Sequence, residues 1–242
     1  MKKPLIGITA PWSVETWKSD PEDGGYYYVG QPYVEAVVRA GGIPVLLCPE
    51  YTEESLHDYV KQYVQSVDGI LFSGGGDVKR DSDEELPTLR GQQPVRYDFE
   101  AELMKQAYEQ GVPVMGICRG FQMMVEVFGG TLAEDTITGH SQKVAPEQTW
   151  HPITIELDTA LHDIVGQSNW DVNSYHIQKV GDMPKDFVLT AKAEGDIVEG
   201  IELTEKNFVG FQFHPEYLAR RDDKAKAIFD RFLQSVKENM EK

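Results

Sequence analysis

The chain has 242 residues, 40% of them apolar, and its 40 acidic against 23 basic residues give a net charge of −17. This length and apolar content suffice for one sizeable hydrophobic core, so we expect a single domain covering residues 1–242. The negative charge argues against nonspecific binding to nucleic acid or to an anionic membrane surface. No stretch of the sequence reaches the length of about 20 consecutive apolar residues that a membrane-spanning helix needs.

Apolar runs that fit buried strands alternate with amphipathic segments through the first half of the chain. Strands are predicted at residues 5–10, 43–49, 67–73 and 112–117. Helices are predicted at residues 32–42, 53–66, 96–111 and directly after Cys118. This alternation is typical of a doubly wound α/β fold, flavodoxin-like in arrangement, with a mostly parallel sheet flanked by helices and ligands at the carboxyl ends of its strands.

The second half of the chain is less regular and begins with a polar segment at residues 129–150, which we expect to cover the site. Further strands are predicted at residues 151–157, 187–193, 196–203 and 207–214, with a short helix at residues 160–166. They indicate a small antiparallel β addition. The chain ends in an amphipathic helix at residues 219–242, whose packing stripe is predicted to be Ala227, Ile228, Phe232, Leu233 and Val236.

Cys118 is the candidate nucleophile, because it lies where a predicted strand turns into a helix. Gly116 and Gly120 flank it in a G-x-C-x-G pattern, which fits a nucleophile elbow: small neighbours let a strained turn push the sulfur out of the sheet. A thiolate at the start of the following helix is stabilised by the positive end of the helix dipole, and Arg119 could add to that field. Taken alone, the pattern also fits a buried structural cysteine.

Three glycines, Gly74 to Gly76, directly follow the predicted strand at residues 67–73. Their backbone N–H groups can approach a ligand closely. A phosphate cradle is one interpretation, but the lysine and hydroxyl residue of a P-loop are missing, as is a G-x-G-x-x-G run. We therefore favour a loop that donates hydrogen bonds to an oxyanion.

His214, Pro215 and Glu216 supply a base and its orienting acceptor at the end of a predicted strand. Residues i and i+2 of an extended segment point to the same face, so Glu216 is expected to hold the imidazole of His214. A tripeptide of this kind also occurs by chance. Together with Cys118, it indicates a cysteine-dependent hydrolase site.

The other cysteine and histidines are assigned no chemistry. Cys48 is interpreted as core packing, and a disulfide with Cys118 is not expected, because the chain lacks a secretory signal and is predicted to be cytoplasmic. His140, His151 and His162 have none of the close spacings of zinc ligands, so they are expected to be surface or loop residues, and no metal site is predicted.

Four motifs carry a resemblance to a known family: GICRGFQ, GFQFHPE, SGGGDV and VNSYHIQ. Through these motifs the chain resembles the class I glutamine amidotransferase-like superfamily, and most closely its γ-glutamyl-γ-aminobutyrate hydrolase branch. The resemblance extends from about Leu5 to Tyr217. Two motifs depart from that branch: KRDSDEE stands where P-x-x-Y-G-E is common, and His176-Ile177-Gln178 stands where HHQ is common. Both departures concern the rim of the pocket, so the motifs do not determine which substrate is bound.

The resemblance implies a role for each matching residue. Cys118 attacks a γ-glutamyl carbonyl, His214 transfers the proton and Glu216 orients His214. Backbone N–H groups of Arg119 and of Gly75 or Gly76 stabilise the oxyanion. The residues implied in holding the glutamyl group are Gln122 and the backbone of Ser174, Tyr175 and His176.

The leading hypothesis is therefore a stand-alone hydrolase of γ-glutamyl amides, with a small γ-glutamyl substrate, no cofactor, and neither a nucleic-acid nor a membrane partner. Two alternatives stay open: a glutaminase subunit that supplies ammonia to a separate synthase, and a non-catalytic binding protein of the same fold. A homodimer is compatible with the sequence. Closure of the Pro11–Gly30 loop or of the Asp81–Glu85 segment over the substrate is also left open.

Overall fold

The fold is taken from a computed structural model, which describes residues 2–13, 25–75 and 89–242. Within these residues the main sheet has nine strands in the order β4-β1-β5-β6-β11-β10-β9-β7-β8. Its first five strands are parallel: β4 (Ile43–Leu47), β1 (Leu5–Thr9), β5 (Gly69–Phe72), β6 (Val114–Ile117) and β11 (Phe208–Phe211). The mostly parallel α/β architecture expected from the sequence is confirmed.

The antiparallel addition continues the same sheet beyond β11. It consists of β10 (Ile197–Leu203), β9 (Val188–Ala193), β7 (His151–Ile155) and β8 (Asn169–Val172), each antiparallel to its neighbour. A separate pair, β2 (Trp12–Ser13) and β3 (Tyr26–Tyr27), forms a two-stranded ribbon. The predicted strand at residues 207–214 ends earlier, at Phe211, because the chain turns before Pro215 starts a helix.

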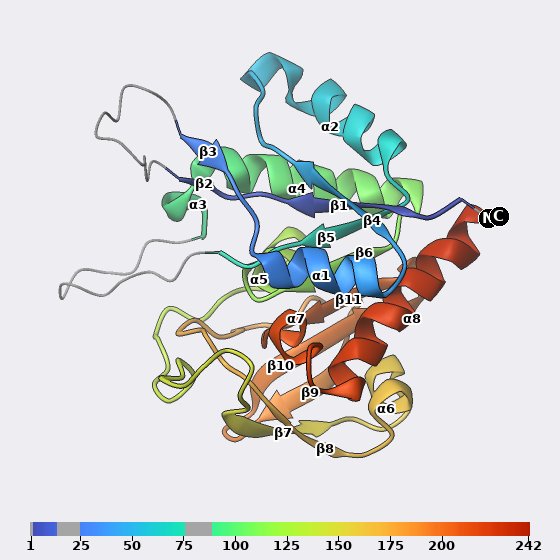
Figure 1. The fold of residues 1–242 in the computed structure, drawn as a ribbon. Coiled ribbons are helices and arrows are strands. Elements are labelled where there is room, and N and C mark those ends of the chain that lie inside the picture. The colour runs from blue at the N-terminus through green and yellow to red at the C-terminus, as the bar shows by residue number, and fades with distance from the viewer. Residues whose placement is uncertain (1, 14–24, 76–88) are drawn as a thin grey trace.

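Helices cover both faces of the sheet (Figure 1). On one face, contacts join α1 (Gln31–Arg39), α6 (Ala160–Val165), α7 (Pro215–Leu218) and α8 (Asp223–Met240). On the other face, contacts join α2 (Leu56–Ser66), α3 (Leu89–Gln92), α4 (Pro94–Gln110) and α5 (Arg119–Val127). Short 3-10 turns are formed by Glu53–Ser55 and Thr204–Lys206. Each helical layer closes its own hydrophobic core against the sheet.

Local signals set the ends of the helices. Helix α4 starts at Pro94, a residue tolerated in the first turn, and ends at Gly111, which has the left-handed φ of 69° common after a helix. Helix α8 starts after Asp222, whose side chain accepts a hydrogen bond from the N–H of Lys224. These signals fix where α4 begins and ends and where α8 begins.

Two packing predictions need correction. In α8 the predicted stripe residues Ile228, Phe232, Leu233 and Val236 are buried, but Ala227 is only partly buried, and Ala225 and Phe229 complete the stripe. Cys48 is half-buried rather than a core residue, because it follows the edge strand β4. Both cysteines are free. Among the described residues, no helix is long and apolar enough to cross a bilayer.

Candidate active site

The site lies where three neighbouring parallel strands end. In register, Phe72 of β5 pairs with Gly116 of β6, and Ile117 of β6 pairs with Phe211 of β11. The residues that follow these strands, Ser73 onward, Cys118, and Gln212 onward, therefore meet at one edge of the sheet. This is the edge at which open α/β sheets bind ligands.

Cys118 occupies a strained turn between β6 and α5. Its φ of 52° and ψ of −103° lie outside the regions that a residue with a side chain usually adopts. Its N–H donates to the carbonyl of Phe211 at 2.7 Å, which fixes the turn against β11. The two glycines are needed for space: a Cβ on Gly116 would meet the carbonyl oxygen of Gly120 at 2.7 Å, and a Cβ on Gly120 would overlap the backbone of Phe72. The sequence therefore builds a nucleophile elbow.

His214 and Glu216 lie together, with 2.6 Å between the imidazole Nδ1 and the carboxylate Oε1. Both side chains are buried. The backbone that brings them together differs from the predicted extended segment. His214 is the residue before α7, and Glu216 lies in the first turn of that helix. Asn173 fixes the backbone of His214 from both sides, because its Oδ1 accepts from the His214 N–H and its Nδ2 donates to the His214 carbonyl, each at 2.9 Å.

The surroundings of His214 favour its protonated form. Burial alone would lower its pKa, but the charges of Glu216 and Cys118 and hydrogen bonds with both outweigh burial and hold the pKa of His214 well above its ordinary value. The arrangement supports a thiolate and imidazolium pair oriented by a carboxylate.

Replacement of Glu216 with glutamine is expected to lower the pKa of His214, because it removes the negative charge that holds the imidazolium. A folded-state pKa above the unfolded value of about 6.5 stabilises the protein below that pH, and this contribution is lost as pH rises through the folded value. The stability of Glu216→Gln should therefore change less with pH over this window than that of the wild type. Imidazole NMR titration and urea unfolding at several pH values measure both effects.

Glu147→Gln is the matched control, because Glu147 forms an ion pair with Arg220 rather than with His214. If Glu147→Gln and Glu216→Gln shift the titration of His214 equally, Glu216 does not hold the imidazole.

The loop after β5 lies against the nucleophile. The N–H of Gly74 donates to the hydroxyl of Tyr33 at 2.9 Å, and a Cβ on Gly74 would lie 3.2 Å from His214 Cε1 and 3.8 Å from Cys118 Cβ. Gly75 packs on Arg119, with 2.6 Å between its would-be Cβ and Arg119 Cδ. Two residues predicted to supply oxyanion donors are thus adjacent, and the N–H of Arg119 lies in the first turn of α5, where no intrahelical acceptor exists.

Gly76 and the Asp81–Glu85 segment lie outside the described residues, as does most of the Pro11–Gly30 loop. Tyr33 was not singled out by the sequence argument. Burial, and then the charges of Glu216 and Cys118, raise the pKa of the Tyr33 hydroxyl well above its ordinary value, so it stays protonated beside the catalytic groups.

A buried charge cluster supports this loop from behind. Arg96 Nε donates to Glu100 Oε1 at 2.8 Å, and Arg119 pairs with the other oxygen of the same carboxylate. The second arm of Arg96 donates to the carbonyls of Ser73 and Gly74 at 3.1 and 3.2 Å. The Arg119 guanidinium is thus paired with Glu100, and burial holds its pKa well below the ordinary value. Sequence reasoning missed Arg96 and Glu100, whose i,i+4 spacing on α4 was the available signal.

The residues predicted to hold the glutamyl group are partly engaged inside the protein. Gln122 is buried, and its Nε2 donates to Gln212 Oε1 at 3.1 Å. The N–H of Ser174 donates to Gln142 Oε1 at 2.7 Å, and the N–H of His176 donates to the His140 carbonyl at 2.9 Å.

Of this set, Tyr175 lies at the thiol, because its carbonyl oxygen is 4.0 Å from Cys118 Sγ. The substrate roles of Gln122, Ser174 and His176 stay predictions.

A second cluster of ionisable side chains gathers around Glu199 on β10. His140 lies in a loop, as expected, whereas His151 lies on β7, and their side chains are only 11% and 15% exposed and face the Glu199 carboxylate. His176 faces it too and is 1% exposed. These side chains come from segments far apart in the sequence, so no spacing could reveal the cluster. His162 lies on α6 outside it.

The electrostatics of this cluster are unusual for a protein interior. Burial would raise the pKa of Glu199, but the facing imidazoles of His140 and His176, and the charge of His151, lower it to about 2. Burial is the main cause that lowers the pKa of His151. Of the described residues, His140, His151 and Glu199 also meet the distance criterion for holding a metal ion, with ligand atoms within 4.8 Å of one another.

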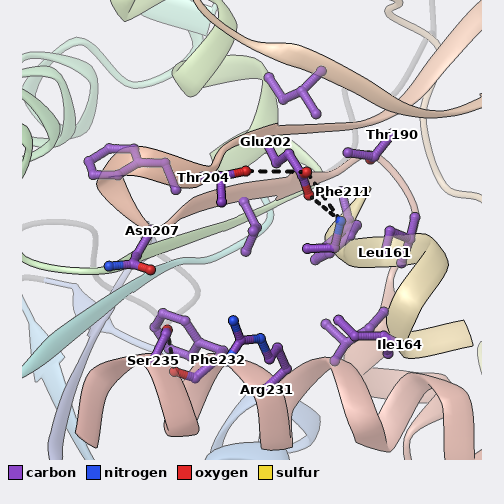
Figure 2. Close-up of a pocket in the computed structure, with 15 residues that line it drawn as sticks. Leu161, Ile164, Thr190, Glu202, Thr204, Asn207, Phe211, Arg231, Phe232 and Ser235 are labelled. Carbon is purple, nitrogen blue, oxygen red and sulfur yellow. Dashed lines mark hydrogen bonds between the residues drawn. The ribbon is translucent and has the colours of Figure 1, made fainter. Parts of the chain in front are cut away.

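An apolar cavity lies away from the candidate catalytic residues. Figure 2 shows it between α6, α8 and the strands β10 and β11, lined by apolar side chains such as Leu161, Ile164 and Phe232. Its volume is about 60 Å³. None of the predicted site residues lines it, so we do not assign it as a substrate site.

Comparisons with known proteins agree with this geometry. The peptidase C26 family model matches residues 4–216. Protein NtpR of Enterococcus hirae is 31% identical over 96% of this chain and 98% of its own, and a γ-glutamyl-γ-aminobutyrate hydrolase of Escherichia coli O157:H7 is 25% identical over 87% of each chain. A crystal structure of a glutamine amidotransferase from Thermotoga maritima shares the fold, with a TM-score of 0.61 at 15% identity over 99% of this chain and 96% of its own. The chain belongs to the peptidase C26 family of class I glutamine amidotransferase-like proteins.

Proposed function

We propose that the protein is a cysteine hydrolase that cleaves γ-glutamyl amide bonds of small amines, amino acids or short peptides and releases glutamate. The observation that carries this proposal is the meeting of Cys118, at a strained elbow, with His214, whose Nδ1 lies 2.6 Å from Glu216. The similarity to a γ-glutamyl-γ-aminobutyrate hydrolase supports the choice of bond.

In the first half of the reaction, Cys118 Sγ attacks the γ-carbonyl carbon and the carbonyl oxygen becomes an oxyanion. We assign the N–H groups of Arg119 and Gly75 as its donors, and each such donor contributes about 3 kcal/mol of transition-state stabilisation. The imidazolium of His214 then gives its proton to the departing amine nitrogen. The C–N bond breaks and a γ-glutamyl thioester on Cys118 remains.

In the second half, His214 acts as a base and takes a proton from a water molecule that attacks the thioester. The C–S bond breaks, glutamate leaves, and the thiolate and imidazolium pair is restored. Glu216 keeps the same hydrogen bond to Nδ1 in both halves, so Nε2 remains the nitrogen that exchanges protons. These steps use only groups of this chain and water.

A panel of substrates tests the proposal. Glutamate release is measured with γ-glutamyl-γ-aminobutyrate, γ-glutamyl anilide and glutamine, with α-glutamyl anilide as the control that has the same groups but the wrong bond. We expect turnover of γ-glutamyl amides and none of the α-linked control. Hydroxylamine should divert the thioester to γ-glutamyl hydroxamate, detectable by mass spectrometry.

Other outcomes would select the remaining alternatives. Turnover of glutamine alone, stimulated by a second protein, would indicate a glutaminase subunit. No turnover of any γ-glutamyl compound, combined with a thiol that iodoacetamide labels no faster than Cys48, would indicate a non-catalytic protein. Either result contradicts the proposed stand-alone hydrolase.

A further inference from the structure

The cluster around Glu199 has the arrangement of a coordination site. The carboxylate Oε1 lies 3.3 Å from His140 Nδ1, 3.6 Å from His151 Nε2 and 3.4 Å from His176 Nε2. The imidazole rings are themselves grouped, with centroids of His140 and His151 4.5 Å apart and of His140 and His176 4.9 Å apart. Three imidazoles therefore face one buried carboxylate oxygen, and among the described residues the ligand atoms of His140, His151 and Glu199 all lie within 4.8 Å of one another.

The separations are too long for charge-assisted hydrogen bonds, which span about 2.7–2.9 Å between nitrogen and oxygen. They match a shared cation instead. In a tetrahedral site with bonds of about 2.1 Å, neighbouring ligand atoms lie about 3.4 Å apart. None of the three inward nitrogens, nor either oxygen of Glu199, has a hydrogen-bond partner in the described part of the chain.

Hydrogen bonds of the outer ring nitrogens fix the tautomer of two histidines, so that a nitrogen with a lone pair faces inward. His176 Nδ1 lies 2.9 Å from the carbonyl of Gln178, and His151 Nδ1 lies 3.1 Å from the carbonyl of Pro152. A carbonyl oxygen only accepts, so each Nδ1 carries the proton, and in the neutral ring Nε2 carries a lone pair. A lone pair aimed at a carboxylate is repulsive unless a proton or a metal cation lies between them. Hydrogen bonding of the outer nitrogen to a carbonyl is also the usual support of a metal-bound histidine.

We propose that His140, His151 and Glu199 bind a divalent transition-metal ion, with zinc the metal that this ligand set favours. Imidazoles and a carboxylate are the borderline ligands that zinc takes in tetrahedral geometry, and three protein ligands leave one position for a water molecule. His176 faces the same carboxylate from outside the ligand set. The charge of the Glu199 carboxylate and the ion together remains only +1.

The site would pin the wall of the active site opposite the nucleophile. His176 directly follows Tyr175, whose carbonyl faces the thiol, and the Oγ of Ser174 donates to the carbonyl of His140 at 2.6 Å. One ion would thus tie the 140 loop, the start of β7 and β10 together, and the 174–176 segment is joined to the 140 loop by the Ser174 hydrogen bond. Loss of the ion is expected to loosen the substrate wall and to lower stability.

Metal content and cobalt spectroscopy test the proposal without an activity assay. The full chain carrying Cys118→Ala is used, so that the nucleophilic thiol cannot bind the ion. After removal of bound metal with a chelator, we expect one Zn²⁺ per chain on reconstitution and a rise in the thermal midpoint with zinc. Stoichiometric Co²⁺ should give the intense visible absorption of a tetrahedral nitrogen and oxygen site.

Ligand variants locate the ion, with a histidine outside the cluster as control. Glu199→Gln and His151→Ala, each in the Cys118→Ala background, should weaken zinc binding on the order of 100-fold, whereas His162→Ala should leave it unchanged. The proposal is wrong if the parent Cys118→Ala chain takes up no stoichiometric zinc or cobalt and its thermal midpoint does not change with zinc. The proposal is also wrong if the folded ligand variants bind zinc as tightly as His162→Ala does. If a ligand variant does not fold, the zinc and cobalt measurements on the parent chain test the proposal.

Discussion

Substitution of Cys118 with alanine should lower kcat for γ-glutamyl amide hydrolysis by about four to six orders of magnitude, the range for loss of a catalytic nucleophile. The reason is that Cys118 Sγ is the atom that forms the bond to the substrate, and the nearby His214 has no other thiol to activate. Steady-state glutamate release from purified variants measures the loss. Far-ultraviolet circular dichroism verifies that the fold is retained.

Cys48→Ala is the matched control, because it removes the second free thiol of the chain. Burial and the charge of Glu50 raise the pKa of Cys48, so this thiol is expected to stay protonated and to react slowly. Iodoacetamide should therefore label Cys118 first at neutral pH. Full turnover by Cys118→Ala, or equal loss in both variants, would overturn the assignment of Cys118 as nucleophile.

Replacement of Glu100 with glutamine should lower the free energy of unfolding by about 3–5 kcal/mol, because it leaves two buried guanidinium groups without their shared carboxylate. The side chains of Arg96 and Arg119 are 2% and 4% exposed, so water cannot compensate. In a chain of this size each kcal/mol lowers the thermal midpoint by about 2–4 °C. Urea unfolding and differential scanning calorimetry measure the change.

Glu102→Gln is the control on the same helix, because Glu102 pairs with the largely exposed His57. An exposed pair of this kind contributes about 0–1 kcal/mol. Glu100→Gln should also reduce kcat, since Arg96 would no longer hold the carbonyls of Ser73 and Gly74 next to the predicted oxyanion donors. Equal stability of the two variants would mean that the buried cluster does not stabilise this edge of the sheet.

The order of the parallel elements could be predicted from the sequence, because apolar runs and helical periodicity are local properties of the chain. The elbow at Cys118 was visible for the same reason: Gly116 and Gly120 mark it within five residues. The end of β11 was not predictable, since Pro215 is compatible both with an extended segment and with the first turn of a helix.

The local motifs also indicated the catalytic residues, but not the groups that hold them. Asn173 fixes His214 through two backbone hydrogen bonds across 41 residues of sequence. Tyr33 reaches Gly74 from α1, also 41 residues away. Such contacts depend on which strands are neighbours in the sheet, and no spacing within one segment encodes that.

The sequence by itself determined the α/β fold and indicated Cys118, His214 and Glu216 as candidate catalytic residues, because each rests on a short run of residues whose conformation is set locally. Only the tertiary structure decided where the side chains of His151 and His176 lie. Sequence spacing predicts a surface or loop position for His151, and the resemblance implies that His176 contributes its backbone. The pairing of β7 with β8 and β9, and of β9 with β10, brings their imidazoles to Glu199. A site made of side chains from separate segments exists only once long-range pairing has formed.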